Sequence, residues 1–269
     1  MDLLFTGTGA ADYETVFKCS CENCTTTRAR AARNLRHYSS LLVNGKLLLD
    51  CGPTVPWRLA ELNVHPARVE AIVFTHSHGD HLDAEAVASL LVARGEGRGP
   101  LPVYGNAAAM AALADVAGLE AHEVPAGESV FTCGVALTAV RANHIADREQ
   151  TLNWLISDGQ TRLVYATDTA WPLDDTWQAL LTFHPTAVVA EATFGLLGKG
   201  DHPDLLVHHL NWPEFLRLRQ ELIAASAILS DTPFIATHLS QHLVAPHEEF
   251  SQLAVPPVMV AYDGLMLSL

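Results

Sequence analysis

The feature that most constrains this chain is the polar segment 75–81, THSHGDH, which directly follows the largely apolar run 69–74, VEAIVF. A short apolar run of this kind is typical of a buried strand. Four ligand-type side chains therefore leave one strand end within a single turn: His76, His78, Asp80 and His81. The first two can bind one ion, because residues two apart in extended backbone point the same way. The turn at Gly79 then brings the last two toward a second ion.

Three further ligand-type residues stand where strand-like runs end: His144 after 135–143, Asp168 after 161–167 and His238 after 233–237. Their shared position predicts that these side chains meet the first four. Imidazole and carboxylate ligands suit zinc, manganese or iron. Two adjacent ions form a clamp for in-line displacement at phosphorus or at carbonyl carbon. The residues thus favour a two-metal catalytic site over a merely polar surface loop.

Strand-like and helix-like stretches of ordinary length alternate along the chain, without a repeat or a low-complexity linker. A hairpin closed by an Asn44-Gly45 type I′ turn is predicted, and the first helix is expected to start only after it, near Pro53. A later helix over 211–225 begins with Asn211 as its N-cap. This order predicts two sheets packed face to face with helices outside, a four-layer αββα sandwich of the α/β class.

The length of 269 residues and the hydrophobic share of 49% fit one domain, which we expect to span residues 1–269. No apolar run reaches the roughly 18 to 20 residues of a membrane span, and the start lacks a basic leader. We therefore expect a cytoplasmic protein without membrane contact. A net charge of −14 makes long nucleic acid an unfavourable partner but allows a small anion drawn to bound metal. A homodimer is left open.

Three of the five cysteines crowd into the segment CSCENC, at Cys19, Cys21 and Cys24. A group this tight is unsuited to disulfides that connect distant segments. In a reducing compartment it is typical of a metal site. Cys51 and Cys133 stand alone near apolar stretches, and we interpret both as small core residues.

The HSHGDH segment, followed by a histidine, an aspartate and a histidine in that order, resembles the metallo-β-lactamase superfamily. The resemblance covers the chain from Leu3 to its last strand-like run and implies a hydrolase with two metal ions. It assigns three ligands to each ion: His76, His78 and His144 to the first, and Asp80, His81 and His238 to the second. By the same resemblance Asp168 bridges the ions with a nucleophilic hydroxide, and Asp50 supports the ligand loop from beneath.

The three-cysteine loop resembles the PhnP branch of that superfamily, in which three cysteines and a histidine hold a structural zinc as a closed tetrahedron. The fourth ligand implied here is His242, which lies four residues past the last catalytic ligand where three are expected. The phosphodiesterase branches also imply a histidine general acid, assigned here to His209 with Glu191 orienting its ring. His202 and His208 are the alternative acids.

The PhnP resemblance implies a phosphodiesterase for small cyclic phosphodiesters, such as 5-phosphoribosyl 1,2-cyclic phosphate or a nucleoside 2′,3′-cyclic phosphate. The segment EATF at 191–194 also resembles transfer RNA 3′-processing endonucleases, although the acidic chain lacks their basic surface and long arm. Thioester and lactone hydrolases share the metal motif, and a non-catalytic accessory protein of this fold is a further possibility. No phosphate-clamping residue can be assigned, since Arg36, Arg148 and Lys199 are merely near candidate mouth loops.

Overall fold

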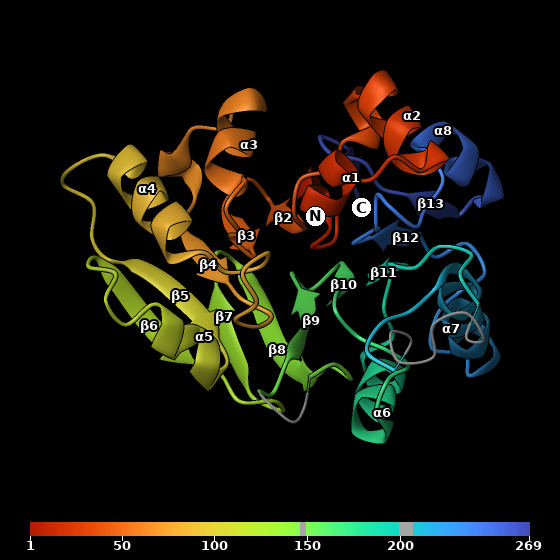
Figure 1. Cartoon of the computed structure of the whole chain (residues 1–269). Coiled ribbons are helices and arrows are strands. Elements are labelled where there is room, and N and C mark those ends of the chain that lie inside the picture. The colour runs from red at the N-terminus through yellow and green to blue at the C-terminus, as the bar shows by residue number, and fades with distance from the viewer. Residues whose placement is uncertain (146–148, 199–206) are drawn as a thin grey trace.

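The computed structural model describes residues 1–145, 149–198 and 207–269, which form two seven-stranded sheets packed face to face (Figure 1). The strands of the first sheet are β1 (Asp2–Gly7), β2 (Ser40–Val43), β3 (Leu47–Leu49), β4 (Ala71–Val73), β5 (Leu101–Gly105), β6 (Leu119–Glu123) and β14 (Met266–Ser268). Those of the second are β7 (Ser129–Thr132), β8 (Val135–Arg141), β9 (Leu152–Ser157), β10 (Arg162–Ala166), β11 (Ala187–Glu191), β12 (Phe234–Thr237) and β13 (Val258–Val260).

Helices cover the outer face of each sheet, so the four-layer αββα sandwich expected from the sequence is confirmed. The helices are α1 (Tyr13–Lys18), α2 (Glu22–Arg30), α3 (Val55–Glu61), α4 (Ala84–Arg94), α5 (Ala107–Ala112), α6 (Asp174–Phe183), α7 (Trp212–Ala224) and α8 (His247–Phe250). Short 3₁₀ turns occupy Ala32–Asn34, Pro66–Arg68 and Ser251–Leu253. Each sheet is mixed, with β3 to β6 and β10 to β13 pairing in parallel and the remaining neighbours antiparallel.

Three apolar clusters fill the three spaces between the four layers. One contains residues of both sheets, a second joins α3 and α4 to the first sheet, and a third joins α6 and α7 to the second sheet. Strand β9 shows why the sheets bury both faces: Trp154 and Ile156 belong to the middle cluster, whereas Leu155 between them faces the helices. Both sheets are therefore fixed on two sides, which makes their strand ends rigid supports for a site.

Two local predictions are confirmed. Asn44 and Gly45 connect β2 to β3 with φ of 51° and 66°, and the Lys46 amide donates to the Val43 carbonyl at 3.0 Å, as a type I′ turn requires. At the start of α7 the Asn211 side chain accepts a hydrogen bond from the Glu214 amide at 2.9 Å. Short-range rules suffice in both cases because the interactions involve neighbouring residues.

The expectation that the first helix starts near Pro53 is wrong. Helices α1 and α2 come earlier, between β1 and β2, and α3 begins only at Val55. Helix α2 buries only Cys24 and Thr27, so it lacks the apolar periodicity by which a helix is recognised. Among the two lone cysteines, Cys51 is buried as expected, whereas Cys133 is only half-buried.

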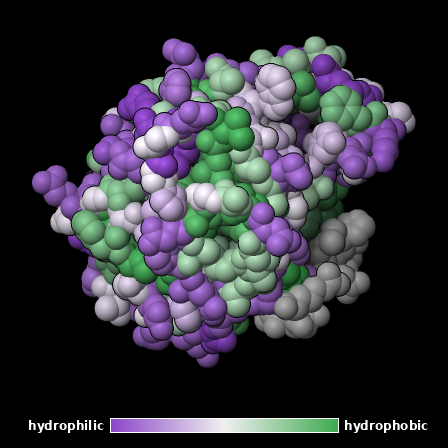
Figure 2. Space-filling model, turned by 90° about the vertical axis from the view of Figure 1, so that its left-hand side faces the viewer, coloured by the Kyte–Doolittle hydropathy of each residue, from purple (hydrophilic) through white to green (hydrophobic). Residues whose placement is uncertain are grey.

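The surface over α3 and α4 mixes hydrophilic and hydrophobic side chains (Figure 2). Trp57 of α3 and Val92 of α4 are both largely exposed. Among the described residues no helix combines the length and apolar character that a membrane crossing requires.

Candidate metal centre and active site

The seven ligand-type side chains come together where four strands end. Residues 76–81 follow β4, His144 follows β8, Asp168 follows β10 and His238 follows β12. They form two groups in which the ligand atoms lie within 4.8 Å of one another: His76, His78, His144 and Asp168 in the first, and Asp80, His81 and His238 in the second. All except the half-buried His78 are buried. The structure therefore brings all seven residues together, with Asp168 in the first of the two groups.

Asp168 lies between the two groups. Its Oδ2 is 2.8 Å from His81 Nε2 and 3.0 Å from His238 Nε2, whereas its Oδ1 is 3.7 Å from His144 Nε2. A carboxylate with one oxygen toward each group has the geometry of a ligand that bridges two ions.

The histidines present nitrogen atoms that fit metal ions. His81 Nε2 and His238 Nε2 face each other at 3.3 Å, and His76 Nε2 and His144 Nε2 are buried without a hydrogen-bond partner among the described residues. Leaving a buried polar atom unsatisfied costs free energy. Divalent cations at these positions would satisfy all four nitrogens. The histidine side chains therefore fit the two metal ions that the sequence predicts.

The second ring nitrogen of each of these histidines is held by the protein. His81 Nδ1 lies 2.8 Å from Asp50 Oδ2, and Asp50 also accepts from the Thr75 amide at 2.8 Å. The remaining contacts pair His76 Nδ1 with Thr75 Oγ1, His238 Nδ1 with Thr193 Oγ1, and His144 Nδ1 with the His208 carbonyl, at 2.9, 2.9 and 3.0 Å. Such contacts fix the ring orientation and direct Nε2 toward the centre. Asp50 lies beneath the ligand loop, as expected.

Tight backbone geometry supports the same centre. Asp50, Asp168 and His238 have φ of 60°, 50° and 51°, in the left-handed region that residues other than glycine rarely adopt. Gly52 approaches the Asp80 backbone so closely that a Cβ there would lie 2.0 Å from the Asp80 carbonyl oxygen. The surrounding fold thus holds the ligand-bearing turns in conformations that are unfavourable for isolated peptides.

His209 and Glu191 form a pair beside the metal groups. Glu191 is fully buried, and its two oxygens lie 3.0 and 3.1 Å from His209 Nδ1. Burial opposes a charge on His209, but the carboxylates of Glu191 and Asp168 outweigh it and raise the pKa of His209 to about 9. His209 also lines a cavity of about 340 Å³ together with Asp80, Asp168 and His238. Glu191 therefore orients the ring, which borders the cavity over the candidate metal centre.

The remaining candidate residues lie elsewhere or are engaged. His208 Nδ1 lies 2.9 Å from the His144 carbonyl oxygen. Arg36 is buried and donates to Thr8 Oγ1 at 2.6 Å and to the Ala261 carbonyl at 2.7 Å, while burial lowers its pKa to about 10. Arg36 thus serves the fold and is not placed to clamp a phosphate. His202, Arg148 and Lys199 lie outside the described residues.

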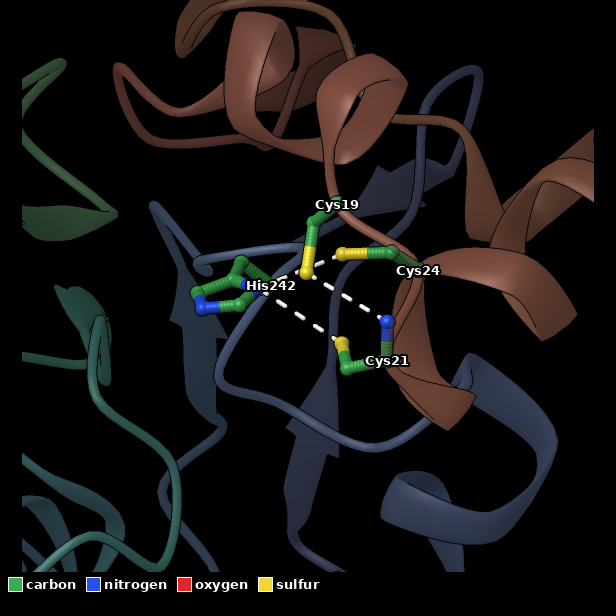
Figure 3. A group of neighbouring side chains, drawn as sticks. All are labelled: Cys19, Cys21, Cys24 and His242. Atoms are coloured by element: carbon green, nitrogen blue, oxygen red, sulfur yellow. Dashed lines mark hydrogen bonds between the residues drawn. The ribbon is translucent and has the colours of Figure 1, made fainter.

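The three cysteines of the N-terminal segment meet His242 in a separate cluster (Figure 3). Cys24 Sγ lies 3.2 Å and Cys21 Sγ 3.7 Å from His242 Nδ1, and Cys19 Sγ accepts from the Cys21 amide at 3.4 Å. A hydrogen bond from the Cys24 backbone helps to lower the pKa of Cys21 to about 7, which favours its thiolate form. Four convergent side chains of this chemistry could hold a tetrahedral zinc.

A family model described as the beta-lactamase superfamily domain matches residues 46–231, more than half of the chain. This chain belongs to the metallo-β-lactamase superfamily. The resemblance inferred from the HSHGDH segment is thereby confirmed. Divalent metal ions are accordingly the expected occupants of the histidine and aspartate groups.

Among curated relatives, ribonuclease Z of Bacillus licheniformis is 31% identical over 107 residues, which cover 39% of this chain and 30% of that protein. Ribonuclease Z of Salinibacter ruber is 51% identical over 49 residues, which cover 17% of this chain and 15% of that protein. Both matches thus span less than a third of the relative. The crystal structure of a diphosphatase from the PhnP family superposes with a TM-score of 0.77 at 22% identity, covering 100% of this chain and 97% of the other. This likeness confirms a PhnP-like fold.

Glu149 is a residue of the site that the sequence did not predict. Its carboxylate accepts from the Ser77 hydroxyl at 2.7 Å, from the Ser77 amide at 3.2 Å and from Asn106 Nδ2 at 2.9 Å. Ser77 stands between the first two candidate ligands, and Asn106 caps α5. Glu149 thus joins the turn that carries the candidate ligands to the start of α5, a helix beside the first sheet. An acid in a polar loop gives no sequence signal of such a contact.

We expect Cys21→Ser to lose about one zinc ion per chain and to unfold at a lower denaturant concentration, because a closed Cys₃His site contributes folding free energy. The kcat on a working substrate should change much less. Elemental analysis and urea unfolding measure these effects, and Cys133→Ser is the control that should keep all its metal. An unchanged zinc content in Cys21→Ser would contradict the assignment.

Glu149→Ala should weaken binding of the catalytic metals by about 10- to 100-fold, the usual effect of removing a group that orients a metal site. Titration with zinc in competition with a chromophoric chelator measures the affinity. The exposed acid Glu128, replaced by alanine, is the matched control. If both variants bind zinc as the wild type does, Glu149 has no part in ordering the ligand turn.

Proposed function

We propose that this chain is a two-metal phosphodiesterase for small cyclic phosphodiesters, of the 5-phosphoribosyl 1,2-cyclic phosphate or nucleoside 2′,3′-cyclic phosphate type. The observation that carries the proposal is the oriented pair of His209 and Glu191. His209 Nδ1 lies 4.0 Å from Asp168 Oδ1, at the edge of the candidate metal centre. Breaking a phosphodiester releases an alkoxide that needs a proton, and this pair is placed to supply it. The ribonuclease Z and PhnP-family relatives agree with phosphoester chemistry.

The proposed metal ligands follow the two observed groups, with Asp168 shared between them: His76, His78 and His144 for one ion, and Asp80, His81 and His238 for the other. When bound, two divalent cations supply Lewis acidity at the phosphoryl oxygens and make water more acidic. Zinc, manganese and iron all suit these donors. The four inward-facing Nε2 atoms support this assignment.

Side chains of the protein itself orient the metal ligands and provide the proton for the leaving oxygen. Glu191 accepts from His209 Nδ1 and so fixes the ring. His209 Nε2 then donates its proton to the leaving oxygen. Asp50 and Thr193 hold the rings of His81 and His238, so that the ligands need little reorganisation during the reaction.

A transfer RNA 3′-processing endonuclease is the second candidate, favoured by the match to ribonuclease Z over 107 residues. The net charge of −14 disfavours it, because long RNA is bound mainly through phosphate neutralisation. A thioester or lactone hydrolase would use the same metal ligands but would not need an acid at His209. A non-catalytic accessory protein would need neither the complete set of ligands nor the acid.

We further propose that Cys19, Cys21, Cys24 and His242 hold one structural zinc. Thiols that bind metal rather than forming disulfides suit a reducing compartment, which supports a cytoplasmic location. A small-molecule substrate is the partner that this proposal requires.

A substrate comparison tests the proposed function. The highest kcat/KM should be found with a small cyclic phosphodiester, ahead of a short RNA, a thioester and a lactone, and a chelator should abolish turnover until zinc or manganese is restored. Asp168→Ala should be inactive, whereas alanine at the exposed Asp231 should leave the rate unchanged. Faster turnover of the thioester or the lactone would overturn the phosphodiesterase assignment.

His209→Ala should lower kcat/KM on a cyclic ribosyl or nucleoside phosphate by about two to four powers of ten, the range of general acid catalysis. An aryl phosphodiester should be affected far less, because nitrophenolate leaves without a proton. Metal content should stay constant, and alanine at the exposed His65 is the control. Equal losses on both substrates would indicate a disturbed metal site instead of a lost acid.

A further inference from the structure

A reciprocal pair of hydrogen bonds connects the segment that carries His209 to the end of β8. His144 Nδ1 lies 3.0 Å from the His208 carbonyl oxygen, and His208 Nδ1 lies 2.9 Å from the His144 carbonyl oxygen. Because a carbonyl oxygen can only accept, both ring nitrogens carry the proton and donate it. Each imidazole therefore binds the main chain of the other residue, and the two segments are held together by two hydrogen bonds.

The same segment is held on its other side by the end of β11. Glu191 accepts from the Leu210 amide at 3.1 Å as well as from His209 Nδ1. These bonds fix the acid-bearing segment relative to β11. The bonds between His208 and His144 fix it relative to β8. The candidate acid is therefore positioned from two different strands of the second sheet.

The His209 ring packs directly against the residue that His208 holds. Its centroid lies 4.8 Å from that of the His144 ring, at an angle of 68°, and 5.3 Å from that of the Phe194 ring. His144 is a candidate ligand of the first metal group, so this contact helps to set the separation between the acid and that group. Separations of this kind matter, because a misplacement of about 1 Å can lower a catalysed rate by about 100-fold.

His208 is not placed to act as the acid itself. Both His144 and His209 line the cavity over the candidate metal centre, whereas His208 is absent from the described residues that line it. A general acid must reach the oxygen that it protonates. The His208 ring instead donates to the main chain, which suits a residue that orders the site without touching the substrate.

We propose that His208 is a positioning residue for the general acid: its ring ties the segment of His209 to the end of β8. Replacing the ring by a methyl group leaves the His208 carbonyl, so His144 Nδ1 keeps an acceptor while the segment loses the bond that the His208 ring donates. The inference rests on the proposed function, because the proton of His209 is needed only where a poor leaving group departs.

Kinetics with two substrates at excess zinc test the proposal. His208→Ala should lower kcat/KM on a nucleoside 2′,3′-cyclic phosphate by about 10- to 100-fold, the scale expected for a misplaced catalytic group. An aryl phosphodiester should be affected far less, since nitrophenolate leaves without a proton. His208→Asn should restore most of the rate, because its amide can donate from near the position of His208 Nδ1. Metal content should stay constant in both variants.

A double-mutant cycle decides whether His208 acts through the acid. In a His209→Ala background, His208→Ala should cause little further loss, because residues that act as a unit are not additive. His122→Ala, which removes a half-buried histidine of β6, is the matched control and should keep the full rate. Additive losses, equal losses on both substrates or no rescue by asparagine would overturn the proposal.

Proton exchange separates this inference from the proposed function. In the wild type, the Nδ1 proton of His209 bonded to buried Glu191 should give a slowly exchanging signal in the NMR spectrum. His208→Ala should speed its exchange, and His208→Asn should slow it again. If these changes occur but the wild type hydrolyses no phosphodiester, the proposed function fails and the positioning role is supported. If the wild type does hydrolyse phosphodiesters and His208→Ala exchanges and turns over as it does, only the inference fails.

Discussion

The Asp168 carboxylate, placed between two groups of histidines, is the interaction on which the rest of the site depends. Its oxygens lie 2.8 Å from His81 Nε2 and 3.7 Å from His144 Nε2, in surroundings almost closed to solvent. Burying several carboxylates and imidazoles together is costly unless cations or hydrogen bonds compensate. Metal ions held by the inward-facing nitrogens would supply this compensation, and they would couple folding to metal binding at one residue.

The sandwich makes this arrangement possible by fixing both sheets between apolar layers. Ligands arise from the first sheet through β4 and from the second through β8, β10 and β12, so neither sheet carries the site alone. Left-handed backbone at Asp50, Asp168 and His238 costs on the order of 1 to 3 kcal/mol at each residue. The three apolar clusters around the strands supply the stability that tolerates this strain.

The N-terminal helix pair connects two further features to the centre. Cys19 and Cys21 lie in the turn between α1 and α2, Cys24 lies in α2, and α1 carries the rings of Tyr13 and Phe17. Asp12, just before α1, accepts from the Ser240 hydroxyl at 2.5 Å and from the His242 amide at 3.1 Å. One carboxylate thus links the start of α1 to the loop after His238, so the segment that would hold structural metal also borders the cavity over the candidate metal centre.

The sequence by itself determined the sandwich, the strand-end positions of the histidines and aspartates, and the Asn44-Gly45 turn, because each is encoded in local periodicity or in neighbouring residues. The two helices before β2 were not predictable, since α1 has only six residues and α2 has no apolar repeat. Only the tertiary structure decided that Glu149 contacts the turn of candidate ligands and that Tyr38 meets Tyr13. These contacts connect residues between 25 and 72 positions apart. Such proximity is set by the packing of whole layers, which no local pattern encodes.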